Sequence, residues 1–194
     1  MTSSGPLLIV GLGNPGPGYA NHRHNVGAMV LDELASRTGA RLRRHKAAQA
    51  LVAEVRLGSG SGGLAGPRAV LARPTTFMND SGGPVAGLCG FYSLRPDDVV
   101  AIHDDLELPF GEIRVKRGGG EGGHNGLRSI SRSLKTRDYL RVRVGIGRPP
   151  GREEPGDFVL KPFATTQRKN VPLIVSDAAD AIDDLCRRPD RIAP

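Results

Sequence analysis

Residues 7–25 read LLIVGLGNPGPGYANHRHN and decide the fold of this chain. The first four are apolar, and a run of that length predicts a short buried strand. Glycine at 11, 13, 16 and 18 and proline at 15 and 17 exclude a longer ladder, because proline lacks an N–H and glycine favours turns. The resulting loop carries Asn14, Tyr19, His22, His24 and Asn25. Since open α/β sheets bind ligands at the carboxyl edge of their strands, this loop is the candidate active site.

Strand-like and helix-like segments alternate along the rest of the chain. Strands are expected at 51–57, 69–72, 99–105, 113–117 and 139–146, a loop at 148–156, and helices at 26–35, 84–92, 127–134 and 166–186, the last interrupted near Pro172. This order predicts the α/β class, a three-layer αβα arrangement with a twisted mixed, mainly parallel sheet. No domain boundary is visible, so residues 1–194 are expected to form a single domain, with a flexible connection at the glycine- and serine-rich residues 58–63.

The chain is strongly basic. With 194 residues and 38% hydrophobic content it is long enough to bury a core, while its net charge of +7 indicates an anionic partner, nucleic acid before membrane. Residues 114–148 include ten lysines and arginines but only two acidic residues, Glu121 and Asp138. A second basic cluster consists of Arg41, Arg43, Arg44 and Lys46. Charge alone leaves open that these side chains form an ordinary solvated surface.

Cysteine content and hydropathy indicate a cytoplasmic protein. Two cysteines, Cys89 and Cys186, form neither a disulfide framework nor a metal-binding pattern, which fits a reducing compartment. The first residues contain no charged segment, and the apolar run at 7–10 is too short for a signal sequence. No apolar run approaches the roughly 20 residues of a membrane span, so no membrane partner is expected.

Polar residues follow four of the predicted strands. They are Asn14 and His24 after the first, Asn79 with the apolar Phe77 and Met78 after the third, His103, Asp104 and Asp105 at the acidic strand end, and His124 and Asn125 after the glycine-rich run 118–123. If the strands are mainly parallel, these groups meet at one edge of the sheet. Together they supply histidine, carboxylate and asparagine amides.

This inventory favours hydrolysis by an activated water molecule. A histidine beside a carboxylate acts as a general base at neutral pH, because the carboxylate fixes its tautomer and stabilises the imidazolium. The sequence has no Gly-x-Ser-x-Gly elbow, and Cys89 falls in a predicted helix, so a side-chain nucleophile is not indicated. Asparagine amides both donate and accept hydrogen bonds, which suits gripping a peptide or polarising a carbonyl.

Several motifs in one order carry a family resemblance. They are GLGNPG at 11–16 with Tyr19 and RHN at 23–25, PTTFMN at 74–79 followed by Ser81 and Gly82, HDDLELPFG at 103–111, GGHNGL at 122–127, and RVGIGRP at 143–149. Together they resemble bacterial peptidyl-tRNA hydrolase from residue 7 to about residue 163. Five separate motifs are far more specific than any one of them.

The resemblance implies an enzyme that cleaves the ester between a peptide and the 3′-terminal ribose of tRNA and so recycles tRNA. It places the catalytic base on His24, its supporting carboxylate on Asp104, and the residue that helps separate blocked from free aminoacyl ends on Asn14. It places substrate binding on Tyr19, Phe77, Met78, Asn79 and Asn125, with His124 as a further member of the site. We expect a monomer that acts on peptidyl-tRNA with no cofactor and no metal ion.

Cations beside the glycine-rich run are expected to hold phosphates. Arg114, Lys116, Arg141 and Arg143 stand next to it in the sequence, and the family's tRNA-phosphate contacts resemble Lys116 and Arg143 most closely. Such contacts hold nucleic acid with little regard to base sequence. Sparse aromatic residues argue against a groove that stacks single-stranded bases.

Structural explanations compete with several of these roles. His24 alone can be read as a loop histidine, Asn25 as the cap of the following helix, and Asp104 as a turn cap. His22 is expected at the surface, and His103 is expected to pack or cap a strand end. Phe77 and Met78 fit either the core or an apolar wall of the substrate site.

Parts of the sequence are also compatible with two other functions. Residues 11–16 formally fit a dinucleotide-binding fingerprint, but Pro15 and Pro17 interrupt the helix start which that fold needs, and no acidic residue closes the second strand. A metal hydrolase or a non-catalytic RNA-binding module is the other alternative. His-x-His and His-Asp-Asp resemble ligand spacings, yet no matching cluster accompanies them.

Overall fold

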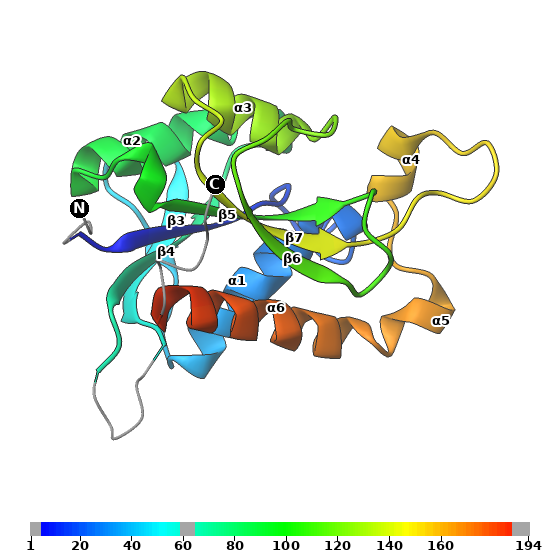
Figure 1. Cartoon of the computed structure of the whole chain (residues 1–194), viewed down its shortest axis with the longest axis horizontal. Helices are drawn as coiled ribbons and strands as arrows, with labels where there is room; N and C mark the ends of the chain where they lie inside the picture. Colours follow the sequence, from blue (N-terminus) through cyan, green and yellow to red (C-terminus); the bar gives the residue numbers. More distant parts are fainter. Residues whose placement is uncertain (1–4, 59–64, 188–194) are drawn as a thin grey trace.

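The computed structural model describes residues 5–58 and 65–187, so most of the expected flexible connection at 58–63 lies outside it. In these residues seven strands form one sheet in the order β2-β3-β4-β1-β5-β7-β6 (Figure 1). The strands are β1 Leu7–Gly11, β2 Arg43–Arg44, β3 Ala50–Arg56, β4 Arg68–Pro74, β5 Val99–Asp105, β6 Ile113–Arg117 and β7 Leu140–Gly145. The neighbours β4, β1, β5 and β7 are parallel, while β3 and β6 run antiparallel to β4 and β7. The predicted mixed, mainly parallel sheet is confirmed.

Helices cover both faces of the sheet. They are α1 Val26–Arg37, α2 Gly82–Tyr92, α3 Asn125–Leu134, α4 Pro155–Val159, α5 Thr165–Arg168 and α6 Val171–Arg187. In Figure 1, α2 and α3 lie on one side of the sheet and α1 and α6 on the other, which confirms the three-layer arrangement. Alternation along β1 supplies both cores, since Ile9 packs with the α1 and α6 side chains and Leu8 and Val10 with those of α2 and α3.

Three segments show where the local predictions agree with the structure and where they differ from it. The C-terminal helical region is interrupted as expected, because α5 ends at Arg168 and Pro172 occupies the first turn of α6, where its missing N–H costs nothing. The expected loop at 148–156 is cut short by α4, which begins at Pro155. The two-residue strand β2 is exposed and has no apolar pattern that would have predicted it.

Strand direction decides which polar residues meet. Because β1, β4 and β5 are parallel, their carboxyl ends lie at the same edge of the sheet, as predicted. The glycine-rich run does not start there, because β6 is antiparallel and its last residue, Arg117, lies opposite Leu140 at the start of β7. This run therefore starts at the opposite edge from the other three segments and passes along β7, yet His124 at its end meets Asp104, as expected.

Within residues 5–58 and 65–187, no helix has the length and apolar character needed to cross a membrane.

A close backbone contact holds α1 against the sheet below the first loop. A Cβ built on Gly27 would lie 2.2 Å from the carbonyl oxygen of Ile102 and 2.8 Å from the amide nitrogen of Leu12. Ala28 also donates its N–H to the carbonyl of Leu12 at 3.0 Å. Only glycine permits this approach, which fixes the start of α1, and hence His24, relative to β5.

We expect Gly27→Ala to lower the free energy of unfolding by about 1–3 kcal/mol, because backbone atoms on both sides leave no room for a methyl group. Urea denaturation followed by circular dichroism measures the change. Gly90→Ala is the matched control, since no heavy atom lies within 4 Å of a Cβ built there in α2. It should gain about 0.5–1 kcal/mol from helix propensity. Equal stability of Gly27→Ala and the unmodified chain would contradict the contact.

Candidate active site

Two imidazoles share one buried carboxylate at the carboxyl edge of the sheet. His24 Nδ1 lies 2.9 Å from Asp104 Oδ1 and 3.1 Å from its Oδ2, and His124 Nε2 lies 3.0 Å from Oδ1. All three residues are less than 10% exposed. His124 Nδ1 accepts the N–H of Leu127, so its Nε2 carries the proton that faces Asp104. His24 correspondingly donates from Nδ1, which leaves its Nε2 lone pair free to accept a proton.

The two neighbouring imidazoles keep Asp104 ionised although it is buried. Burial by itself raises the pKa of this carboxyl, but the imidazoles of His124 and His24 outweigh that effect and hold the pKa of Asp104 well below its usual range. His103 behaves oppositely, since burial and the neighbouring His124 lower its pKa to about 3. Its Nδ1 donates to the carbonyl of Asp104 at 2.8 Å. His103 therefore packs as a neutral ring behind the site, as the sequence favoured.

Two asparagines join the first loop to the turn after β4. Asn25 donates from Nδ2 to the carbonyl of Asn14 at 2.9 Å and accepts the Asn14 N–H at 3.0 Å. Asn25 stands at the N-cap position of α1 but makes no side-chain capping bond, so the capping explanation is wrong. Asn14 Oδ1 accepts the N–H of Met78 at 2.8 Å. This bond fixes the amide of Asn14, whose Nδ2 remains as a donor for another molecule.

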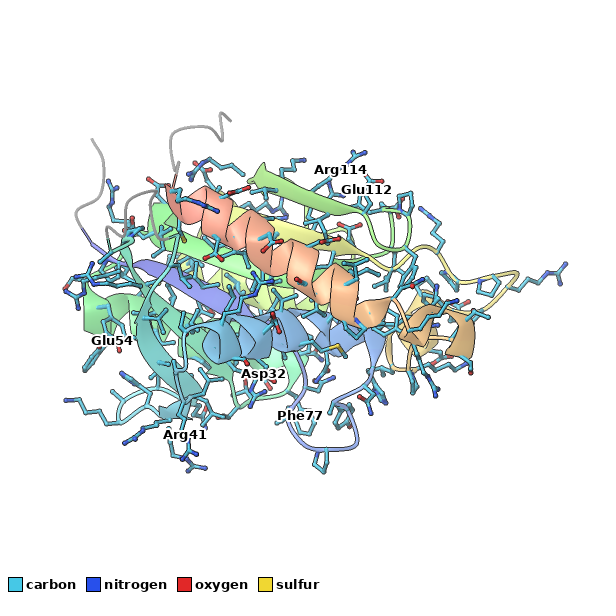
Figure 2. All side chains as sticks on the ribbon, turned by 90° about the horizontal axis from the view of Figure 1, so that it is seen from below. Asp32, Arg41, Glu54, Phe77, Glu112 and Arg114 are labelled. Carbon is cyan, nitrogen blue, oxygen red and sulfur yellow. The ribbon has the colours of Figure 1, made fainter. Side chains whose placement is uncertain are left out.

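The expected substrate-binding residues lie around this junction. Met78 is buried, and Phe77 is 57% exposed, with its ring centroid 6.1 Å from that of Tyr19 in an edge-on contact. Figure 2 shows Phe77 at the periphery of the molecule, so its assignment to the core is wrong. Asn79 and Asn125 are exposed, and within residues 5–58 and 65–187 their side chains make no hydrogen bond to the protein.

The four expected phosphate-binding cations fall into different environments. Lys116 is exposed and, in the part of the chain that the structure describes, has no ion pair. Arg143 is half-buried and uses Nε to bind Asp105 at 2.7 Å. Arg114 is paired with Glu112, as Figure 2 shows. The interpretation of Arg141 as a phosphate ligand is wrong, because it is 2% exposed and bonds to backbone carbonyls.

Arg23 supports the site although the sequence did not single it out. Its Nη1 donates to the carbonyls of Phe158 and Lys161, and its guanidinium carbon lies 3.9 Å from the centroid of the Phe158 ring. Burial lowers the pKa of this guanidinium. Arg23 N–H also donates to the carbonyl of Lys161. These contacts fix the backbone directly before His24, but an arginine between two histidines gives no sequence signal of burial.

Hydrogen bonds join the three side chains of the cluster. Ligand atoms of His24, Asp104 and His124 lie within 4.8 Å of one another, a spacing that a cation could also bridge. However, the imidazole nitrogens facing Asp104 already donate protons to it, and Leu127 occupies the other nitrogen of His124. A bound metal would have to displace these hydrogen bonds.

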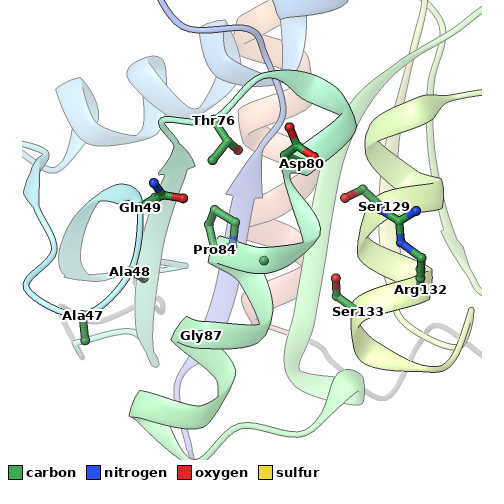
Figure 3. A pocket seen from close by; sticks show the side chains of 11 residues that line it. Ala47, Ala48, Gln49, Thr76, Asp80, Pro84, Gly87, Ser129, Arg132 and Ser133 are labelled. Carbon is green, nitrogen blue, oxygen red and sulfur yellow. The ribbon is translucent and has the colours of Figure 1, made fainter.

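A separate hollow of about 480 Å³ lies between the 47–49 loop, α2 and α3 (Figure 3). Thr76 and Asp80 line its upper end in that view, and Ser129, Arg132 and Ser133 line its α3 side. None of the residues assigned to the candidate site lines it. The hollow is therefore not part of the candidate active site.

We expect His103 to make stability depend on pH. Because its folded-state pKa of about 3 lies below the unfolded value near 6.5, the unfolded chain binds an extra proton between these values. Its contribution to stability is complete above about pH 6.5 and is lost as pH falls toward the folded-state pKa. His103→Asn, which keeps a donor toward the Asp104 carbonyl, should therefore flatten the unfolding free energy between pH 6 and 4 by up to about 1.4 kcal/mol per pH unit. Urea denaturation at each pH measures the unfolding free energy of the two proteins. Equal slopes of that free energy against pH would contradict the prediction.

Comparisons with known proteins show the family of this chain. The family model described as peptidyl-tRNA hydrolase matches residues 8–192. The peptidyl-tRNA hydrolase of Kineococcus radiotolerans is 62% identical over 178 residues, covering 92% of this chain and 89% of that protein. That of Paenarthrobacter aurescens is 61% identical over 176 residues, covering 91% and 88%. The crystal structure of peptidyl-tRNA hydrolase from Acinetobacter baumannii superposes with a TM-score of 0.81 at 33% identity, covering 97% of this chain and 92% of that one. This chain belongs to the peptidyl-tRNA hydrolase family.

Proposed function

We propose that His24 is the general base with which this peptidyl-tRNA hydrolase cleaves the ester between a peptide and the 3′-terminal ribose of tRNA. The observation that carries the proposal is the hydrogen bond from His24 Nδ1 to the buried Asp104 carboxylate. It fixes the tautomer in which Nε2 is unprotonated. In the cell this reaction recycles tRNA from prematurely released peptidyl-tRNA.

The reaction follows from this tautomer. His24 Nε2 takes a proton from water as the water oxygen attacks the ester carbonyl carbon, and the imidazolium that forms is stabilised by the Asp104 carboxylate. The bond between the carbonyl carbon and the ribose oxygen then breaks, and the ribose oxygen takes the proton from the imidazolium. His124 Nε2 donates to Oδ1 of Asp104, the oxygen that also accepts the shorter His24 bond, and keeps the carboxylate turned toward His24.

Amide groups bind the reacting end of the substrate. The fixed Nδ2 of Asn14 and the unengaged amides of Asn79 and Asn125 are donors for the ester carbonyl and the first peptide group. A free α-ammonium would lose its hydration without gaining a carboxylate partner there, which favours N-blocked substrates. Tyr19, Phe77 and Met78 supply an apolar wall for the peptide side chains.

Cations farther from the reacting bond hold the tRNA. Among residues 5–58 and 65–187, Lys116 has no ion-pair partner, and the two terminal nitrogens of Arg143 have none either while its Nε binds Asp105. Lys116 lies on β6 and Arg143 on β7, the two strands next to the glycine-rich run that leads to His124. Contacts of this kind to phosphates supply affinity without base specificity.

The proposal extends to the state of the protein. Residues 1–194 act as one domain, in keeping with the single sheet that the described strands form, and as a monomer whose His24, Asp104 and His124 come from one chain. Cys89 and Cys186 are free and buried thiols, which suits the reducing cytoplasm.

Parallel incubation with an N-blocked aminoacyl-tRNA and with its free-amine counterpart tests the function. We expect release of the blocked aminoacyl group only, and a loss of about 10²–10⁴ in turnover for His24→Ala with tRNA affinity retained. Asp104→Asn should lose less, because the geometry survives while the imidazolium loses its counter-charge. His45→Asn, a histidine change on the 45–49 loop, is the control and should keep turnover. Full activity of folded His24→Ala would overturn the role of His24.

Lys116→Ala tests the phosphate contacts. Removal of one phosphate contact should weaken tRNA binding and reduce the slope of log affinity against log salt by about 1, with turnover at saturation unchanged. Lys169→Ala, an exposed lysine after α5, is the matched control and should keep the full slope. A fall in turnover with binding unchanged would place Lys116 in the chemical step instead.

A further inference from the structure

Arg141 is a buried cation that has no carboxylate partner in the part of the chain that the structure describes. It is the second residue of β7, opposite Ala101 of β5 and Lys116 of β6, and is 2% exposed. Among the described residues it forms no ion pair, although a buried charge is costly unless it is compensated. Compensation comes from main-chain oxygens, since Nη1 donates to Gly120 at 2.6 Å and Nη2 to Gly119 at 2.9 Å and Arg137 at 3.3 Å.

Two of the carbonyls that Arg141 binds belong to the glycine-rich run 118–123, which forms no helix or strand. Residues 118–123 start beside Leu140 and must end where His124 meets Asp104, which lies opposite Val144 in the sheet. Four residues of β7 separate these levels, a path of about 13 Å at the rise of a strand. Glycines 118, 119, 122 and 123 have positive φ, so the run lacks a regular ladder and its ordering is entropically costly.

Arg141 is the central contact of this run with the sheet. At one end, Gly118 N–H donates to the carbonyl of Tyr139 at 3.0 Å. At the other end, His124 N–H donates to the carbonyl of Glu121 at 2.8 Å, and the Glu121 carboxylate accepts from Arg137 Nε at 2.8 Å. Between these ends, the described hydrogen bonds to the run are those of Arg141.

We propose that Arg141 is a positioning residue for peptidyl-tRNA hydrolysis. By holding the carbonyls of Gly119 and Gly120 it fixes the path of residues 118–123, and thereby places His124 against Asp104 and Asn125 at the substrate. The guanidinium suits this role because its planar fork reaches two adjacent carbonyls at once, which an ammonium does not. The role differs from that of Lys116 and Arg143, since a side chain this buried does not reach a phosphate.

Single-turnover and steady-state assays on N-blocked aminoacyl-tRNA test this inference, which rests on the proposed function. Arg141→Ala should lower kcat by about 100-fold, the effect of a displacement near 1 Å in a catalytic constellation. KM and the salt dependence of tRNA binding should stay close to their original values. Millimolar guanidinium chloride should restore part of kcat, whereas sodium chloride at equal ionic strength should not. Arg68→Ala, an exposed arginine at the start of β4, is the matched control and should keep kcat.

The outcomes separate positioning from stability. Folded Arg141→Ala with unchanged kcat overturns the inference, and so does a loss confined to KM. If Arg141→Ala does not fold, Arg141→Lys decides, because it keeps the charge but not the fork; a loss of at least tenfold in kcat supports the inference and full kcat overturns it. Failure of both variants to fold shows a structural residue only and overturns the inference. Loss of activity in His24→Ala, measured alongside, shows separately that the proposed function holds.

Discussion

The buried carboxylate of Asp104 is the constraint on which this structure depends. An ionised group with 4% exposure is tolerable only when donors surround it, and here two imidazole N–H groups lie within 3.1 Å of its oxygens. Each donor comes from a different segment, His24 from the loop after β1 and His124 from the start of α3. Both imidazoles must be held against one carboxylate, and many hydrogen bonds from side chains to the backbone of the surrounding loops hold them there.

Those loops are held mainly by side chains that bind backbone groups. Proline and glycine prevent the segments after β1 and β6 from continuing a ladder, so their carbonyls and N–H groups need other partners. Asn25 satisfies both backbone groups of Asn14, Arg23 binds the carbonyls of Phe158 and Lys161, and Arg141 binds those of the glycine-rich run. Irregular backbone around the site is thus made rigid without a regular element passing through it.

Sequence patterns predicted what depends on local burial and missed what depends on tertiary placement. The strand β5 and the helix α1 were predicted because apolar residues recur with the period of each element. The residues His24, Asp104 and Asn14 came from motifs whose order resembles a family, and the structure brings them to one edge. The direction of β6 was missed because antiparallel pairing leaves no trace in a five-residue segment. Arg23 was given no role and Arg141 was wrongly interpreted as a phosphate ligand, because charge in a sequence does not report burial.

The two buried arginines show why carbonyl partners suit this site. A carboxylate near Asp104 would compete for the imidazole protons and raise its pKa, whereas a carbonyl dipole compensates a guanidinium without adding a negative charge. The one neighbouring carboxylate on β5, Asp105, is bound by Arg143, and the pKa of Asp105 is lowered despite its burial. Both imidazoles are therefore left to Asp104. The arrangement concentrates negative charge beside His24, where the proposed reaction forms an imidazolium, and main-chain dipoles compensate the charges of Arg23 and Arg141.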